Sequence, residues 1–424
     1  MRAVCAVFAA TALAACGTAG PGTGAGGGAG EPVVIWALQD EALNKIEQDS
    51  INRFGADKAK LETFANDPYK QKLRVALGSP QAPDAFFNWG GGNLKEYVDA
   101  GKVADLTGLL DSKPELKAAF LPSVLDGAKI NGKHYGIPMR GMQPVVLFYN
   151  KKVFTEAGAE PPKTWDDLLA LVDTFKGKNI TPISLAGSQA WTELMWAEYV
   201  LDRIAGPEVF QNIRDNGPAG WKDPAVVEAM TALKGLIDRG AFGDNFASVG
   251  YDIGGASTLL AQGRAAMHLM GSWEYTNQLS QSPDFVKAGD LGWVPFPEIP
   301  GGKGDPGNVV GNATNYYSLT EGSPQLDAAK EFVSTQLTSP EYVKALIDAG
   351  DVPAVAGIEE QLKSAPNAEY TQWVYGIAKD APTFQLSWDQ DLPADQAEFM
   401  LTQLQEFFLG KVSPQQFADS LASR

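Results

Sequence analysis

The residues best suited to bind a small molecule in this sequence are its tryptophans and the polar side chains beside them. The chain has ten Trp, and three adjoin an amide or a carboxylate near the predicted end of an element: Asn88-Trp89, Trp273-Glu274 and Trp388-Asp389. A flat indole face covers the apolar C–H patch of a sugar ring, while the polar neighbour takes its hydroxyls. The pairs therefore predict a carbohydrate site, although any single Trp is equally suited to filling a core.

Signatures of catalysis and of metal or cofactor binding are absent from the sequence. It contains no G-x-x-x-x-G-K-[ST] loop, no G-x-S-x-G elbow, no H-E-x-x-H and no EF-hand loop. With two His and two Cys, it lacks ligands for zinc, haem or iron–sulfur sites, and we expect His134 and His268 to be structural. The Gly-rich run Trp89-Gly90-Gly91-Gly92-Asn93 lacks the spacing and the lysine of a phosphate cradle. We predict a non-enzyme without cofactor or metal, with a glycosidase carboxylate pair as the open alternative.

Length and charge narrow the class of protein further. The chain has 424 residues, and 34 Lys and Arg against 51 Asp and Glu give a formal net charge of -17. Such an acidic chain is unsuited to nucleic acid, which needs a basic face, and equally to a polybasic membrane surface. The length predicts two or three domains, each able to bury a core.

The first thirty residues are predicted to lie outside the folded body. Arg2 precedes a short apolar run that ends on Leu13-Ala14-Ala15-Cys16-Gly17. The run is too short for a transmembrane helix and fits an export signal over residues 1–15. Its end resembles the lipobox of a bacterial lipoprotein precursor, which implies a lipid on Cys16; an ordinary secretory peptide is the alternative. The Gly-rich residues 16–30 are predicted to form a flexible tether, and no other stretch is long enough to span a bilayer.

The remaining chain is predicted to be α/β. Short apolar runs predict buried strands at residues 33–36, 72–76, 85–87, 145–149 and 265–269. Amphipathic patterns between them, such as residues 42–54, predict helices. Helix starts are marked by Thr164-Trp165-Asp166-Asp167, which is typical of a capping box, and by Asp223-Pro224 and Ser339-Pro340. This alternation predicts sheets flanked by helices.

Several segments follow one another in an order and spacing that match a known family. They lie at residues 83–89, 97–106, 132–138, 147–151, 162–165, 265–273 and 339–342. Together they resemble the extracellular solute-binding proteins of carbohydrate ABC importers, the broad family that includes maltose-binding protein. The Asn-Trp-Gly-Gly-Gly run and the lipobox resemble members from high-GC Gram-positive bacteria.

The resemblance implies a two-lobed, periplasmic-binding-protein-like α/β fold with a hinge and a ligand cleft between the lobes. The crossings between lobes would fall near residues 142–145, 291–295 and 347–352. Lobe one would then comprise residues 31–143 plus 294–347, and lobe two residues 145–291 plus 350–424. We expect a monomer.

The resemblance also implies which residues bind the ligand. Trp273, after Gly271-Ser272, matches the stacking aromatic of lobe two, whereas Arg140 is either a clamp for hydroxyls or part of a structural salt bridge. Leu38 and Gln39 stand where the family frequently has aromatic residues. The full set of implied ligand-binding residues is Asp40, Glu41, Asn88, Trp89, Arg140, Trp191, Trp273, Glu274, Asn312, Asn315, Asp351, Trp388 and Asp389.

The implied function is a non-enzymatic receptor at the extracellular face of the cell membrane, held there by a lipid anchor. It would capture a di- or oligosaccharide by lobe closure, with xylo- or gluco-oligosaccharides favoured. It would then deliver the sugar to the transmembrane subunits of an ABC permease, and no nucleic acid would take part. The alternatives are a secreted carbohydrate-active enzyme and a receptor for a peptide or a polyamine.

Overall fold

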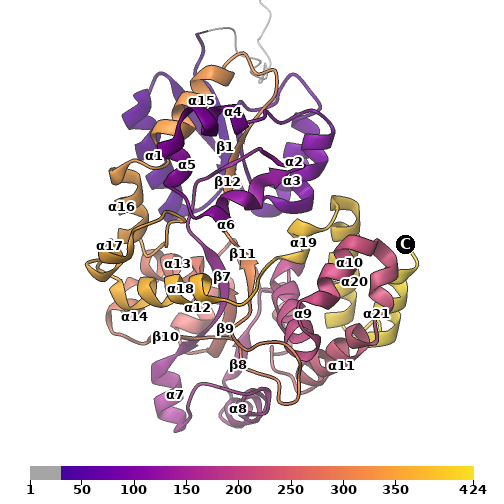
Figure 1. Ribbon diagram of the computed structural model, residues 1–424. Coiled ribbons are helices and arrows are strands. Elements are labelled where there is room, and N and C mark those ends of the chain that lie inside the picture. Colours follow the sequence, from indigo (N-terminus) through magenta and orange to yellow (C-terminus); the bar gives the residue numbers. More distant parts are fainter. Residues whose placement is uncertain (1–29) are drawn as a thin grey trace, which may run out of the picture.

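The protein consists of two halves, each built around its own mixed β-sheet and stacked one above the other (Figure 1). The structure is a computed structural model that describes residues 30–424. The predicted export signal, Cys16 and nearly all of the tether lie outside the described residues. Among the residues described, no helix combines the length and the apolar character that a bilayer crossing needs.

The first sheet combines the N-terminal region with one strand from much later in the chain. Its order is β2-β1-β3-β12-β6. The strands are β1 (Val33–Leu38), β2 (Ala59–Phe64), β3 (Ala85–Asn88), β6 (Ile137–Pro138) and β12 (Tyr316–Leu319). Both β2 and β3 run parallel to β1, and β12 is antiparallel to β3 and β6. The sheet is therefore completed by a strand about 180 residues beyond β6 in sequence.

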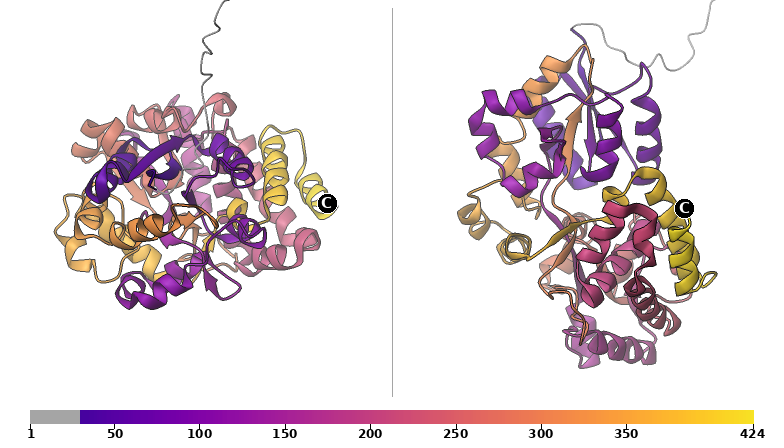
Figure 2. Two further views of the ribbon diagram at one scale, coloured as in Figure 1. Left: turned by 90° about the horizontal axis from the view of Figure 1, so that it is seen from above. Right: turned by 45° about the vertical axis from the view of Figure 1, so that its right-hand side comes forward.

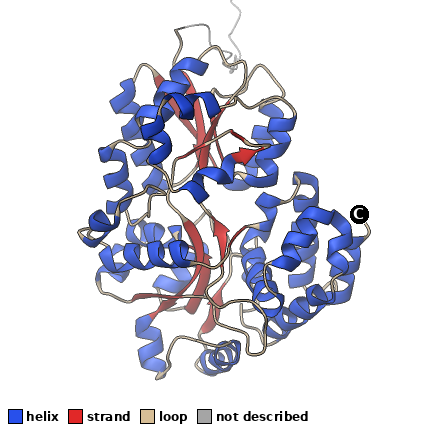
Figure 3. Cartoon of the chain, in the orientation of Figure 1, coloured by secondary structure: helices blue, strands red, loops and turns tan. Residues whose placement is uncertain are grey.

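Helices from the same two regions cover the first sheet (Figures 1 and 3). They are α1 (Glu41–Gly55), α2 (Asn66–Ala76), α3 (Gly91–Asp99), α4 (Thr107–Ser112), α5 (Pro114–Ala118), α6 (Pro122–Leu125), α15 (Leu326–Thr335) and α16 (Pro340–Asp348). A small hairpin, β4 (Lys129–Ile130) with β5 (Lys133–His134), follows the 3-10 turn Asp126–Ala128. The strand predicted at residues 72–76 is wrong, because that run ends α2. There Tyr69, Leu73 and Ala76 are buried at helical spacing.

The second sheet is formed by the middle of the chain and one late strand. Its order is β13-β11-β7-β9-β8, and β10 also pairs with β7. The strands are β7 (Gln143–Asn150), β8 (Thr181–Ser184), β9 (Ala265–Gly271), β10 (Leu291–Val294), β11 (Val309–Asn312) and β13 (Phe384–Leu386). The antiparallel pair β7 and β9 forms its centre and contains the predicted runs 145–149 and 265–269. All seven residues of β9 are buried.

The second half carries most of the helices, and α9, α11, α20 and α21 form a separate layer beside the sheet (Figure 1 and Figure 2, right). Those that follow β7 are α7 (Lys151–Ala157), α8 (Trp165–Gly177), α9 (Ala190–Ala205), α10 (Glu208–Asn216), α11 (Pro224–Asp238), α12 (Gly255–Ala261), α13 (Trp273–Gln281) and α14 (Pro283–Lys287). The C-terminal ones are α17 (Glu359–Lys363), α18 (Ala368–Asp380), α19 (Trp388–Asp391), α20 (Ala394–Phe408) and α21 (Pro414–Ala422), and 3-10 turns lie at Gly217–Lys222 and Phe246–Ser248.

The helix starts are capped as their residue types predict. Thr164 accepts the Asp167 N–H while the Asp167 carboxylate accepts the Thr164 N–H, which completes the capping box of α8. Asp223 and Ser339 cap α11 and α16 without a reciprocal bond: their side chains accept the N–H groups of Ala225 and Tyr342, and each directly precedes a Pro.

The chain passes three times between the two cores, and one of these crossings is not where we predicted it. The first lies between Met139, buried in the first core, and Met142, buried in the second. The third crossing passes Val352 and runs beside the first crossing, because the Met142 N–H donates to the Val352 carbonyl at 2.8 Å. The second lies at residues 313–315, between β11 and β12, and not at residues 291–295.

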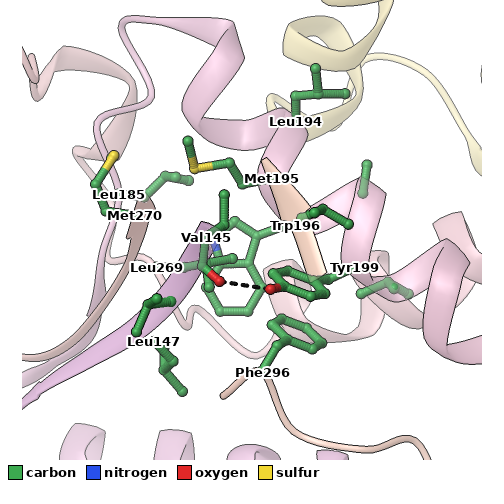
Figure 4. Packing of buried hydrophobic residues seen from close by; sticks show 14 of the residues in the cluster. Val145, Leu147, Leu185, Leu194, Met195, Trp196, Tyr199, Leu269, Met270 and Phe296 are labelled. Carbon is green, nitrogen blue, oxygen red and sulfur yellow. Dashed lines mark hydrogen bonds between the residues drawn. The ribbon is translucent and has the colours of Figure 1, made fainter. Parts of the chain in front are cut away.

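The physical reason is that the segment after β10 stays in the second core. Phe296 stacks on Tyr199 with ring centroids 4.5 Å apart, beneath the hydrogen bond from the Tyr199 hydroxyl to the Val145 carbonyl (Figure 4). The strand β11 then pairs with β7. Residues 294–312, which we assigned to lobe one, therefore belong with the second half.

Candidate binding cleft

A cavity of about 260 Å³ lies between the two halves. Of the residues implied by the resemblance, those on its wall are Asp40, Glu41, Trp89, Arg140, Trp191, Trp273, Asn312, Asn315 and Asp389. Those that do not line it are Asn88, Glu274, Asp351 and Trp388. Residues of both halves and of two crossings thus surround one space, as in ligand sites between domains.

The first half contributes the start of α1, which follows the end of β1. Asp40 caps this helix, because its Oδ1 accepts the Leu43 N–H at 2.9 Å. Glu41 is exposed in the first turn of α1. These carboxylates lie at the C-terminal edge of the parallel strand β1, where α/β sheets generally present their ligand-binding loops.

Arg140 lies beneath this edge and is held mainly by its own half. Its Nε and Nη2 both donate to Oε1 of Glu47, at 2.9 and 2.8 Å. Arg140 is 5% exposed and Glu47 2% exposed. Burial raises the pKa of the Glu47 carboxyl, and the Arg140 guanidinium offsets part of that rise. Of the two roles predicted for Arg140, the salt bridge is thus the one seen here. Its Nη1 makes a longer ion pair with Oδ2 of Asp40, 4.0 Å away at the cavity.

The second half contributes an aromatic wall. Trp273 and Trp191 lie with ring centroids 6.4 Å apart, and Trp191 contacts Tyr251 edge to face at 5.4 Å. Gly271 is required for this arrangement, because a Cβ there would lie only 1.9 Å from the Trp273 ring. The indole can therefore fold back over the end of β9, toward the cavity. Tyr251 was not predicted, since it lies in a loop without a pattern of its own.

Glu274 positions the aromatic wall from behind, and its predicted place on the ligand surface is wrong. It is fully buried, and its Oε2 accepts the hydroxyls of Tyr251 and Ser257 at 3.0 and 2.9 Å. Its Oε1 accepts the amide of Gln278 at 2.7 Å. Every donor comes from the second half, so the carboxylate fixes the orientation of Tyr251 within its own half.

Two amides at the second crossing, Asn312 at the end of β11 and Asn315 within the crossing, line the cavity and have unused hydrogen-bonding capacity. Asn312 and Asn315 are 7% and 1% exposed. Among the described residues, neither Oδ1 of Asn312 nor Nδ2 of Asn315 has a hydrogen-bond partner. Because a buried polar atom without a partner costs about 1–3 kcal/mol, this acceptor and this donor are suited to ligand hydroxyls.

One end of the cavity is formed where the two halves touch. Nζ of Lys70, on α2, lies 2.7 Å from Oδ2 of Asp389, on α19. The same ammonium lies 4.9 Å from the centroid of the Trp89 ring. Gln390 donates to Asp389 at 2.8 Å and also lines the cavity. Lys70 was missed because the ion pair joins residues more than 300 positions apart in the sequence.

Trp388 belongs to the second core and not to the cleft. It is 2% exposed and stacks on Phe210 with centroids 4.9 Å apart and ring planes 10° from parallel. Trp221 packs against its edge. The sequence pattern of an indole beside a carboxylate therefore identified Asp389 as part of the wall, whereas the indole next to it faces inward.

Asn88 and Asp351 hold backbone segments instead of lining the cavity. Asn88 donates to the Ser318 hydroxyl at 2.8 Å and accepts the Gly90 N–H at 2.9 Å, which fixes the turn after β3. Asp351 accepts the Gly141 N–H at 2.8 Å and the Val352 N–H at 3.0 Å, so it ties the first crossing to the third. Burial raises the pKa of Asp351 to about 6.

The cavity wall also includes residues that no sequence pattern indicated, and the described residues contain no metal site. The unpredicted wall residues include Asn66, Lys70, Phe87, Gln143, Met195, Tyr251, Asp252, Asn277 and Gln390. No group of three or more His, Cys, Asp or Glu within residues 30–424 is arranged to hold a metal ion. His268 is buried with Nδ1 2.8 Å from the Ser184 carbonyl oxygen, in a structural role.

Comparisons with known proteins agree on one family. The sequence profile described as "Bacterial extracellular solute-binding protein" matches residues 39–344. The chain is 28% identical over 383 residues to the diacetylchitobiose binding protein DasA of Streptomyces coelicolor, covering 87% of this chain and 85% of that protein. It is 26% identical over 353 residues to the multiple sugar-binding protein of Streptococcus mutans, covering 78% and 80% of the two chains.

Solved structures of other proteins share the fold. A structure from work on xylan utilization by Caldanaerobius polysaccharolyticus superposes with a TM-score of 0.82 at 27% identity, covering 92% of this chain and 99% of that one. A chitin oligosaccharide binding protein also gives a TM-score of 0.82, at 24% identity and with 93% and 98% coverage. These matches confirm the predicted periplasmic-binding-protein-like α/β fold.

Proposed function

We propose, since this chain belongs to the bacterial extracellular solute-binding protein family, that its cleft captures a neutral di- or oligosaccharide. The chain is the carbohydrate-binding component of an ABC importer and acts outside the cell as a transport receptor, not as an enzyme. Xylo- and gluco-oligosaccharides are the favoured ligands within this class. The observation that carries the proposal is the aromatic wall of the second half facing two unpaired amides of the crossing.

The wall is suited to pyranose rings for a physical reason. Trp191 and Trp273 offer flat apolar faces on which the C–H side of a sugar ring can lie. Asn312 and Asn315 supply one acceptor and one donor, and a sugar hydroxyl can satisfy either. A ligand that meets both groups must combine an apolar face with several hydroxyls.

The charge of the cavity supports a neutral ligand. Its wall carries the carboxylates of Asp40, Glu41, Asp252 and Asp389. Its two cations, Lys70 and Arg140, are already paired with Asp389 and Glu47. A phosphorylated or acidic sugar would meet excess negative charge at short range, which is unfavourable in a partly buried site.

We further propose that binding closes the two halves over the sugar. Trp191 and Trp273 lie on the second half and four of the six charged side chains of the wall on the first, so the full set of contacts exists only when both halves approach. A ligand then shifts the equilibrium between open and closed forms by its difference in affinity for the two. A lipid on Cys16 would hold this receptor at the membrane, beside the permease that takes up the sugar.

The experiment that tests the ligand class is a thermal-shift panel. It compares di- and trisaccharides of xylose, glucose, galactose and N-acetylglucosamine with peptides and polyamines; the names of the relatives justify the N-acetylglucosamine series. A ligand at 100 times its Kd stabilises the folded state by about 2.7 kcal/mol, which raises the melting temperature by a few degrees. A rise with one sugar series supports the proposal. A flat response to all sugars together with a rise for a peptide or polyamine contradicts it.

A further inference from the structure

We propose that Gly91, Gly92 and Asn93 form a seat for α19 of the opposite half, and that this seat positions the cleft residues Asp389 and Gln390. The proposal deepens the proposed function, on which it rests, by assigning positioning residues that do not touch the ligand. It also gives a role to the Gly-rich run that begins α3, which is no phosphate cradle.

The first argument is the close approach of two backbones. A Cβ added to Gly91 would lie 2.7 Å from the carbonyl oxygen of Gln390, and one added to Gly92 only 2.4 Å from that of Asp391. Both distances are shorter than non-bonded contacts of a real Cβ, and the opposing atoms belong to backbone. Only glycine therefore allows α19 to lie directly against the start of α3; Figure 1 shows α19 reaching toward the upper half at this point.

The second argument is that the polar contacts at the seat all cross between the halves. Asn93 Nδ2 donates to the Asp389 carbonyl at 2.8 Å. Glu96, one turn further along α3, accepts the Ala394 N–H at 2.6 Å and so supplies the cap of α20, whose own N-cap residue is Pro393. Side chains of the first half thus satisfy the backbone of residues 389–394 of the second.

The third argument concerns what the seat does for the cleft. Asp389 and Gln390 line the cavity, whereas Gly91, Gly92 and Asn93 do not. The backbone of α19 binds α3 while these two side chains form the end of the cavity beside Lys70. The positions of Asp389 and Gln390 therefore depend on the first half, although both residues belong to the second half.

Gly92 offers a clean test. Gly90 and Gly91 have positive φ angles of 80° and 60°, so any side chain there strains the backbone, but Gly92 has no positive φ. It lies inside α3, where Ala is a better helix former than Gly. Gly92→Ala therefore acts through its clash with Asp391. Gly108→Ala is the matched control, because Gly108 lies in α4 of the same half with nothing within 4 Å of its added Cβ.

The expected result has a ligand-free part and a ligand-bound part. Without ligand, amides of residues 388–394 exchange hydrogen faster in Gly92→Ala than in Gly108→Ala, while the melting temperatures of the two variants agree. With the sugar that stabilises the wild type most in the panel, calorimetric titration shows affinity at least tenfold weaker in Gly92→Ala only. Equal hydrogen exchange of residues 388–394, or equal sugar affinity, in the two variants would overturn the proposal of a seat.

A double variant separates positioning from general damage. If Gly92 acts through Asp389, then Gly92→Ala weakens binding less in an Asp389→Asn background than in the wild type. Full additivity of the two losses would overturn the positioning role. Should no sugar of the panel bind the wild type, the proposed ligand class fails, whereas the ligand-free exchange comparison still decides whether the seat exists.

Discussion

The cleft has two walls, a first wall from the first half and a second wall from the second half, and they use their side chains in opposite ways. On the first half, Arg140 is bound to Glu47, and Asp40 caps α1, so the polar groups are largely occupied by the fold itself. On the second half, Glu274 holds Tyr251 from behind, and Trp191 and Trp273 line the cavity. From this difference we expect the second half to supply most of the binding energy, and the first half to orient the ligand and select its charge.

Replacing Arg140 by Met should have the largest effect of these changes, a loss of folding stability at the first wall. The change leaves Glu47 buried without its partner, and removal of one member of a buried ion pair costs about 3–5 kcal/mol. Urea unfolding should report this loss in the free energy of unfolding. Arg53→Met, on the exposed side of α1, is the control and should change it little. A variant that unfolds like the wild type but loses affinity would instead make Arg140 a ligand clamp.

Replacing Trp273 by Ala should remove the main surface of the second wall. Loss of a large aromatic contact in a binding site costs about 1–3 kcal/mol, or roughly 5- to 150-fold in Kd. Calorimetric titration with the best sugar of the panel measures it. Trp373→Ala is the control, because Trp373 is half-buried in the same half but lines a different groove, away from the cleft. Unchanged affinity in Trp273→Ala would remove this residue from the binding surface.

Two parts of the cleft wall lie where a local pattern of the sequence ends, one on each half. Gly271-Ser272-Trp273 follows a seven-residue buried strand, so a local pattern places the indole at a strand end. The start of α1 was likewise local, since Asp40 and Glu41 directly follow the apolar run of β1. The resemblance implied that these three residues bind the ligand, and their local positions agree with their place on the cavity wall.

The sequence could not supply the long-range partners of side chains, the sheet that a strand joins, or whether a side chain faces the core or the cavity. Glu47 lies 93 positions from Arg140, and no local pattern joins them. No strand was predicted at β11, and its four residues do not say which sheet they enter; for that reason the second crossing was misplaced. Trp388 and Asp389 are neighbours with opposite environments, one in the core and one on the cavity.

The core behind the second wall also holds an unpaired carboxyl, which predicts a pH effect. Glu193 is fully buried, neither of its oxygens has a partner among the described residues, and burial raises its pKa from 4.5 to about 9. Between pH 4.5 and about pH 9 this carboxyl ionises only in the unfolded chain. The free energy of unfolding is therefore unaffected by Glu193 below pH 4.5 and falls as the pH rises toward 9.

Glu193→Gln should therefore flatten the decline of the melting temperature between pH 5 and pH 9. We expect a relative gain of about 1.4 kcal/mol for each pH unit above 5, and therefore of several kcal/mol and several degrees near pH 9. Differential scanning calorimetry at several pH values measures the slope, and Glu228→Gln, exposed on α11, is the control that should keep it. An unchanged slope in Glu193→Gln would mean that this carboxyl is ionised in the folded protein.

The smallest effect is expected where the two walls meet, at the Lys70–Asp389 pair. The Lys70 side chain is 27% exposed, so solvent and salt screen the pair, and such pairs contribute about 0.2–1 kcal/mol. Lys70→Gln should weaken sugar binding by less than about fivefold. Lys72→Gln is the control, because its ammonium lies over Phe64 and Trp36 and not on the cavity. A loss above tenfold that persists at high salt would mean that Lys70 binds the ligand directly. The first wall would then contribute binding energy as well as orientation, and the contrast between the two halves would no longer hold.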